Sequence, residues 1–131
     1  MDLSSINYIA LLAAALAGMV SGAAWYGLLA KPWMKAVGYS EEPKQSPGIY
    51  FVAALAQLLI AYMLSVLFLH FPDVSAGGGA LAAFFCWLGF CLAPMAVNHR
   101  FQSKGWDLTL IDGGYWLVVF VLQGAIIGWL G

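Results

Sequence analysis

Charge is scarce in this chain of 131 residues: only 8% are Asp, Glu, Lys or Arg, whereas 63% are apolar. Soluble domains carry about 25% charged and roughly 45–50% apolar residues. A small water-soluble domain cannot bury so much apolar surface, because small domains leave a large fraction of their chain exposed. The formal net charge of −1 also excludes the basic face that nucleic-acid binding needs. The sequence therefore predicts a membrane protein.

Four long stretches contain no Asp, Glu, Lys or Arg at all. A segment that crosses about 30 Å of hydrocarbon needs roughly 20 apolar residues, and it must satisfy its own backbone hydrogen bonds as a helix. We predict an all-α fold: a four-helix transmembrane bundle of two helical hairpins in one domain, 1–131. The first span is expected to be retained, because an acidic residue precedes it where a signal peptide is basic. The predicted spans are residues 6–29, 49–71, 80–97 and 113–130.

All five basic residues fall in two connecting segments. Residues 30–48 and 98–112 hold every Lys and Arg, whereas both termini and residues 72–79 hold none. Because short basic loops stay in the cytoplasm, the first two segments are predicted to be cytoplasmic, with both termini and residues 72–79 outside. Lys31 and Pro32 are expected to open a short interfacial helix. The three glycines at 77–79 are predicted to form a turn.

Metal and haem sites lack the residues they need. Cys86 and Cys91 lie five residues apart in one apolar run, which is neither a Cys-x-x-Cys motif nor a loop closed by a disulfide. His70 and His99 are predicted at opposite membrane faces, so one chain cannot place both on one haem. Two histidines and two scattered cysteines give no zinc spacing either. We expect no metal and no cofactor.

Catalytic templates are missing as well. Two aspartates are predicted outside and two inside, so a Ser-His-Asp triad would have to cross the membrane. His99 and Asp112 form a conceivable acid–base pair at the cytoplasmic face, but no nucleophile or metal accompanies them. The sequence favours a protein that is not an enzyme.

Small residues recur along the spans at intervals of four. Such strips let helix backbones approach closely, which matters because lipid gives helices no hydrophobic reason to associate. Packing within one bundle and self-association through the same strips are both open. The candidate packing residues are Gly18, Gly22, Gly124 and Gly128.

Three polar side chains are candidates for lining a ligand or a permeation path. Gln57 and Gln123 lie toward the middle of the second and fourth spans, where an amide needs a polar partner. An interhelical hydrogen bond is the alternative role for both. Asp112 precedes the fourth span and is expected to cap that helix. Pairing with Arg100 or Lys104, or lining an inward-facing polar cavity, are the other roles open to Asp112.

One pattern of Trp, Gly and Pro occurs twice. It indicates either an internal repeat of two same-direction halves or merely the shared chemistry of helix ends. The second proline either ends or kinks the third span. The two copies are Trp25-x-Gly27-x4-Pro32 and Trp87-x-Gly89-x4-Pro94.

Five motifs along the chain carry a family resemblance. They are Asn7, Gly22-Ala23-Ala24-Trp25-Tyr26-Gly27, Lys31-x-Trp33, Trp87-Leu88-Gly89-Phe90 and Leu110-Ile111-Asp112-Gly113-Gly114-Tyr115. With them, essentially the whole chain resembles the four-helix bacterial membrane family catalogued as domain of unknown function 1761. The resemblance implies a small bacterial inner-membrane protein without an assigned activity, and it brings no catalytic residues.

Three functional hypotheses follow. The first is a non-catalytic accessory or scaffold subunit of the bacterial plasma membrane, which acts through helix–helix association in a homo-oligomer or a larger membrane complex. The first alternative is a small-solute or lipid transporter lined by Gln57, Gln123 and Asp112. The second alternative is a membrane-embedded enzyme that uses His99 and Asp112. The lipid bilayer and other membrane proteins are the expected partners.

Overall fold

The computed structural model describes residues 1–131, and all of its regular structure is helical. Four helical segments are long and apolar enough to cross a membrane, so the predicted fold class is confirmed. The elements in chain order are the 3₁₀ turn η1 (Leu3–Ser5), α1 (Tyr8–Leu28), α2 (Ala30–Val37), α3 (Pro47–Phe68), α4 (Ala76–Trp87), the π-helical turn η2 (Leu88–Leu92), α5 (Ala93–Phe101) and α6 (Trp106–Leu130).

A polar cap fixes the start of the first span. The side-chain oxygen of Asn7 accepts hydrogen bonds from two backbone N–H groups of the first turn of α1, each at 3.1 Å. The Asn7 amide donates to the carbonyl of Leu130 at 2.9 Å, which joins the start of α1 to the end of α6. Just before this cap, hydrogen bonds from the Ser4 hydroxyl and backbone N–H hold the pKa of Asp2 below its usual range.

The short helix predicted at Lys31 and Pro32 is present as α2. It ends at Gly38, whose φ of 96° is the left-handed conformation that commonly terminates a helix. The ammonium group of Lys104 donates to the carbonyl of Val37 at 2.7 Å. This bond ties the end of α2 to the turn between α5 and α6.

The third and fourth spans are longer than the sequence predicts. The helices extend over Ala76–Phe101 and Trp106–Leu130, so the segment predicted as a loop over 98–112 is reduced to residues 102–105. The glycines at 77–79 are helical rather than a turn. A Cβ on Gly79 would overlap the carbonyl oxygen of Gly124, so its missing side chain lets the backbones of α4 and α6 touch. This contact outweighs the low helix propensity of glycine.

The third span passes through an irregular turn instead of ending at Pro94. Pro94 is the second residue of α5 and has no N–H to donate to the preceding turn. The π-helical turn η2, Leu88–Leu92, lies directly before it and keeps the helix continuous. Such turns are rare and often lie at functional sites.

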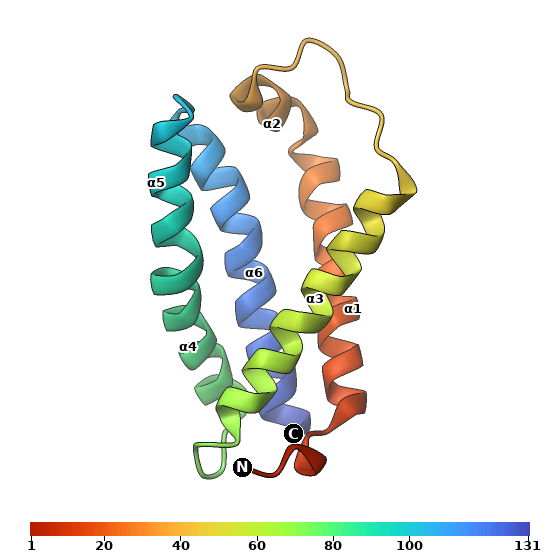
Figure 1. The fold of residues 1–131 in the computed structure, drawn as a ribbon, viewed down its shortest axis with the longest axis vertical. Coiled ribbons are helices and arrows are strands. Elements are labelled where there is room, and N and C mark those ends of the chain that lie inside the picture. Colours follow the sequence, from red (N-terminus) through yellow and green to blue (C-terminus); the bar gives the residue numbers. More distant parts are fainter.

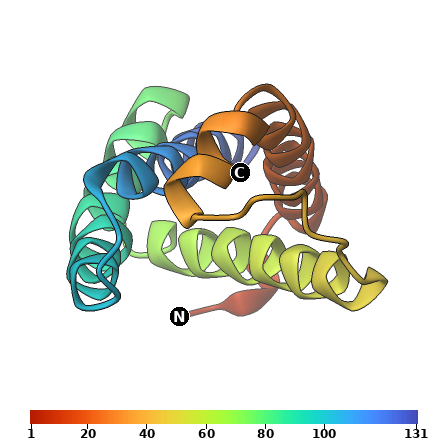
Figure 2. The same cartoon turned by 90° about the horizontal axis from the view of Figure 1, so that it is seen from above.

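Helix α6 is the centre of the bundle. It packs against α1 on one side and against α4 on the other, and α3 packs on α1 and α6. Figure 1 shows α3 crossing the bundle diagonally, close to α4 at the end with the chain termini and far from α5 at the opposite end. Figure 2 looks down the bundle from that opposite end and shows α2 and its following loop lying over it. The core of buried apolar side chains joins α1, α3, α4 and α6.

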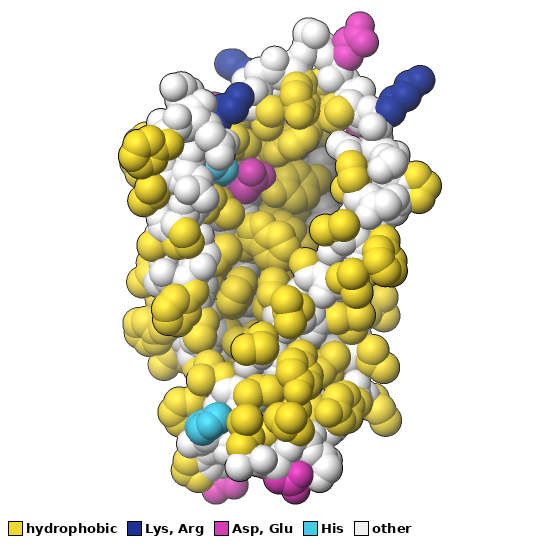
Figure 3. Space-filling view, viewed as in Figure 1, with side chains coloured by type: hydrophobic (Ala, Val, Ile, Leu, Met, Phe, Trp, Pro, Cys, Tyr) yellow, Lys and Arg dark blue, Asp and Glu magenta, His cyan; other side chains and the backbone are white.

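The two ends of the bundle differ in charge. Both termini lie at one end and α2 at the other (Figure 1). The basic side chains visible in Figure 3 gather at the α2 end, while most of the surface between the ends is apolar. Large apolar side chains on this outer surface are widely exposed, for example Ile9 at 79% and Phe90 at 81%. Contact between such a surface and lipid is favourable, whereas its exposure to water is not.

Candidate functional site

A hydrogen-bonded network joins three spans inside the bundle. The Gln123 amide of α6 donates to Gln57 Oε1 of α3 at 2.7 Å, and the Gln57 amide donates to the Tyr115 hydroxyl at 2.8 Å. Tyr115 in turn donates to the carbonyl of Gly18 in α1 at 2.9 Å. Gln57 and Gln123 are only 1% and 0% exposed. The structure thus brings the two predicted glutamines together and adds Tyr115, for which the sequence analysis predicted no such role.

Two of the predicted packing glycines make room for this network. A Cβ on Gly18 would overlap Gln57 Oε1, and a Cβ on Gly22 would lie 2.8 Å from the Tyr115 hydroxyl oxygen. These two glycines of α1 therefore face polar side chains of the same chain.

The other two predicted packing glycines face the backbone of α4. A Cβ on Gly124 would meet the carbonyl of Gly79, and a Cβ on Gly128 would meet the carbonyl of Ser75. All four glycines are thus engaged within one bundle.

One acceptor of the network has no partner. Gln123 Oε1 is buried and receives no hydrogen bond, although the amide nitrogen of the same side chain is bonded. A buried polar atom without a partner is rare and destabilising. Neither glutamine lines any of the four main cavities. The network is therefore closed rather than arranged along an open path.

Asp112 does not cap α6, which corrects the sequence-based expectation. The helix begins at Trp106 with Gly105 as its N-cap, so Asp112 is the seventh helical residue. Its carboxylate accepts a hydrogen bond from the Tyr26 hydroxyl of α1 at 2.7 Å. Asp107 is the acidic residue in the first turn. The prediction failed because the helix starts a full two turns earlier than the charge-free stretch indicates.

Both tryptophans of the repeated pattern bind the same helix. The indole N–H of Trp25 donates to the carbonyl of Ile111, and that of Trp87 donates to the carbonyl of Gly113, each at 2.9 Å. Gly114 leaves room for the first ring, because a Cβ there would lie 2.8 Å from Trp25. The two copies thus hold α6 from α1 and α4 in equivalent ways.

A basic cluster lies at the α2 end, where α5 meets α6. Arg100 donates to the carbonyl of Gly105 at 2.8 Å and to the Thr109 hydroxyl at 2.7 Å, and it stacks on Trp106 with 3.8 Å between Cζ and the ring centre. Nδ1 of His99 lies 2.7 Å from the same Thr109 oxygen. The Nε and Nη1 atoms of Arg100 are buried without partners. Sequence reasoning missed Thr109, because an isolated threonine in a helix carries no pattern.

The two members of the acid–base pair suggested by the sequence share no hydrogen bond in the structure. His99 contacts Thr109, whereas Asp112 contacts Tyr26. His99 lines one of the four main cavities and Asp112 lines none of them. No three of the His, Cys, Asp and Glu side chains are grouped so as to hold a metal ion. The structure thus gives His99 and Asp112 different hydrogen-bond partners.

A cleft of about 490 Å³ separates α3 from α5. Figure 3 shows it as a hollow on this face of the molecule, which narrows toward the end with the termini. Its floor is formed by Trp116 and Phe120 of α6. The remaining lining residues are Ile60 of α3, Phe90 and Cys91 of η2, and Pro94, Met95, Asn98, His99 and Gln102 in and just after α5.

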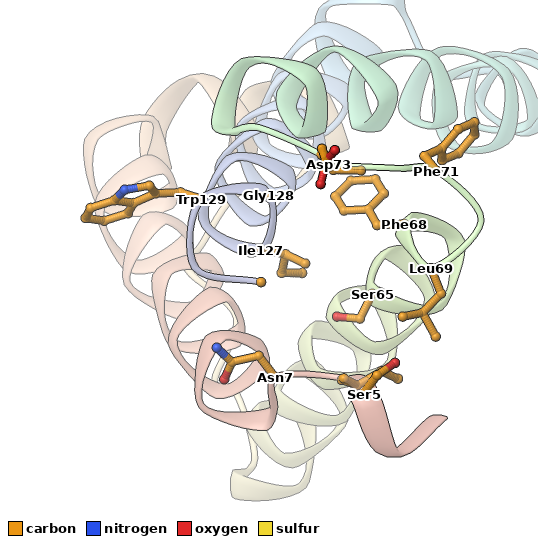
Figure 4. Close-up of a pocket in the computed structure, with 13 residues that line it drawn as sticks. Ser5, Asn7, Ser65, Phe68, Leu69, Phe71, Asp73, Ile127, Gly128 and Trp129 are labelled. Atoms are coloured by element: carbon orange, nitrogen blue, oxygen red, sulfur yellow. The ribbon is translucent and has the colours of Figure 1, made fainter. Parts of the chain in front are cut away.

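A second cavity, of about 470 Å³, lies at the end with the termini. Figure 4 shows that its walls come from the ends of α3 and α6 and from the start of the chain. Its polar residues are largely engaged: Ser65 donates to the carbonyl of Ala61, and Asn7 caps α1 and binds Leu130. It contains no histidine, whereas His99 lines the cleft at α5.

The fold and these interhelical contacts define a small multi-pass membrane protein with a four-helix bundle. Residues 9–128 match the family described as "Protein of unknown function (DUF1761)", and the chain belongs to this family. The resemblance stated from the sequence motifs is thereby confirmed. No curated protein and no solved structure matches the chain.

Proposed function

We propose that this protein is a non-catalytic accessory or scaffold subunit that associates with other membrane proteins, or with further copies of itself, in a bacterial plasma membrane. The observation that carries the proposal is that the polar side chains at depth are used to hold the bundle together. Gln57, Gln123 and Asp112 all bond to neighbouring helices, and none lines a main cavity. This disfavours a transport path lined by these three residues.

Helix α3 offers the surface for association. It packs against α1 and α6 but has no interface of that extent with α4 or α5. Its outer side carries apolar residues spaced four apart. Phe51, Leu55, Leu59 and Met63 are 66%, 49%, 60% and 55% exposed. Such a stripe can pack against an apolar helix of another membrane protein.

A photo-crosslinking phenylalanine analogue at Leu59 is expected to give a protein adduct in native membranes. The matched controls are the same analogue at Leu16 of α1 and at Phe85 of α4, which are 65% and 60% exposed and face lipid in the proposal. Adduct masses from mass spectrometry would distinguish a second copy of the chain from another protein. Lipid adducts alone at all three positions, together with a stable monomer in mild detergent, would contradict the scaffold role.

The orientation follows from the basic loops and is also a proposal. The α2 end holds all five Lys and Arg residues, which favours its placement in the cytoplasm. With Cys86 and Cys91 replaced by alanine, Ser5→Cys is expected to react with a membrane-impermeant maleimide from outside intact cells. Ser40→Cys, which is also exposed, is expected to react only after lysis. The reverse labelling pattern would invert the topology.

A further inference from the structure

The cleft between α3 and α5 has one apolar part and one polar end. Ile60, Phe90, Trp116 and Phe120 supply apolar lining, whereas Asn98, His99 and Gln102 follow one another along the end of α5. That polar end is the end of the bundle at which Arg100 and Lys104 also lie. A ligand that fits this gradient has an apolar chain toward the middle of the spans and a polar head at the α2 end. This is also how a lipid molecule lies in a leaflet.

Two cations near the polar end form no ion pair, and an anionic head could pair with them. Arg100 and Lys104 donate only to neutral oxygens in the structure: backbone carbonyls and the Thr109 hydroxyl. The nearby carboxylates have other hydrogen-bond partners, since Asp112 binds Tyr26 and Asp107 accepts from the N–H of Leu108. Two positive charges are thus left without a carboxylate partner.

Arg100 also has donors without acceptors. Its Nε and Nη1 atoms are buried without partners, and although Arg100 does not itself line the cleft, it shares Thr109 with His99, which does. A guanidinium group forms its strongest hydrogen bonds with phosphate or carboxylate oxygens. Basic pockets between membrane helices bind anionic lipid headgroups for this reason.

We propose that the cleft binds one anionic phospholipid, with an acyl chain along Ile60, Phe90 and Phe120 and the phosphate group at Asn98 and His99, next to Arg100. The cleft opens on the side of the bundle (Figure 3), so a lipid enters it from the bilayer without passing through water. Its volume of about 490 Å³ falls within the roughly 300–1,000 Å³ typical of ligand pockets. The π-helical turn η2, which carries Phe90 and Cys91, shapes its wall. This site is separate from the outer side of α3 used in the proposed association.

Cys91 provides a reporter inside the cleft, and Cys86 provides an internal control outside it. Both thiols are free and partly exposed, but only Cys91 lines the cleft. Alkylation by N-ethylmaleimide is followed by mass spectrometry on the full chain in nanodiscs of pure phosphatidylcholine and in nanodiscs that also contain phosphatidylglycerol. Phosphatidylglycerol is expected to slow the reaction of Cys91 and to leave that of Cys86 unchanged.

Two variants test the headgroup and the chain separately. Arg100→Gln is expected to raise the phosphatidylglycerol concentration needed for protection about fivefold, the effect of one basic group near an anionic lipid. Ile60→Trp fills the apolar part and is expected to abolish the protection while leaving the fold, monitored by circular dichroism, intact. Equal protection by both lipids, or none by either, would overturn the proposal. If the Arg100→Gln variant does not fold, the comparison of the two nanodisc compositions with the wild type, together with the Ile60→Trp variant, still tests the proposal. A monomeric state in the crosslinking experiment would refute the scaffold role without affecting this result.

Discussion

Gly124→Ala is expected to destabilise the bundle by about 3 kcal/mol, because an added methyl group would collide with the backbone of α4. A Cβ at this position would overlap the carbonyl of Gly79 and lie 2.6 Å from Cβ of Ala83. Backbone atoms cannot rotate away as the end of a long side chain can, so α4 and α6 would have to separate. Unfolding by sodium dodecyl sulfate in mixed micelles, followed by circular dichroism, measures the loss.

Gly27→Ala is the matched control for this prediction. Gly27 is also a helical glycine, in α1, but a Cβ there would meet nothing within 4 Å. Its replacement is expected to cause no loss of stability, and the higher helix propensity of alanine can add up to about 1 kcal/mol to the free energy of unfolding. Equal effects of the two substitutions would mean that α4 and α6 do not approach as closely as the structure shows.

Contacts between helices also explain why the sequence did not predict the ends of the third and fourth spans. Absence of charge identifies four membrane-length helices, because hydrocarbon tolerates few ionic groups. It does not fix their ends. Gly79 is helical where its backbone packs against α6, and Asp112, within α6, accepts a hydrogen bond from Tyr26 of α1. Both contacts are made with residues far away in the chain.

The candidate sites were also only partly predictable from the sequence. The sequence indicates that Gln57 and Gln123 each need a polar partner, but it cannot show that Tyr115 completes the network, since that depends on how the helices are rotated. The cleft depends on the tilt of α3 away from α5, which is likewise set by packing and not by the length of the apolar stretch. The repeated tryptophan pattern was likewise visible in the sequence, but the paired bonds of its two indoles to α6 were not predicted from it.

Removing either glutamine of the buried network is expected to destabilise the protein by about 2 kcal/mol, because the other members lose their partner while remaining out of water. Methionine is the appropriate replacement, since it is unbranched like glutamine and keeps the contact with Gly18. In Gln57→Met, the Gln123 amide loses its acceptor at 2.7 Å and the Tyr115 hydroxyl loses its donor. In Gln123→Met, Gln57 Oε1 loses its donor, but the bond between Gln57 and Tyr115 remains.

The double variant decides whether the two residues act as a unit. If they bond mainly to each other, Gln57→Met with Gln123→Met costs about 3 kcal/mol, less than the sum of the two single changes, which gives a coupling energy of about 1 kcal/mol. Gln45→Met, at an exposed glutamine in the loop after α2, is expected to have no measurable effect. Detergent unfolding of the wild type, the two single variants and the double variant gives the coupling energy. Strictly additive single effects would show that the glutamines stabilise the bundle independently, and negligible effects of both would return them to the role of ligand-lining residues.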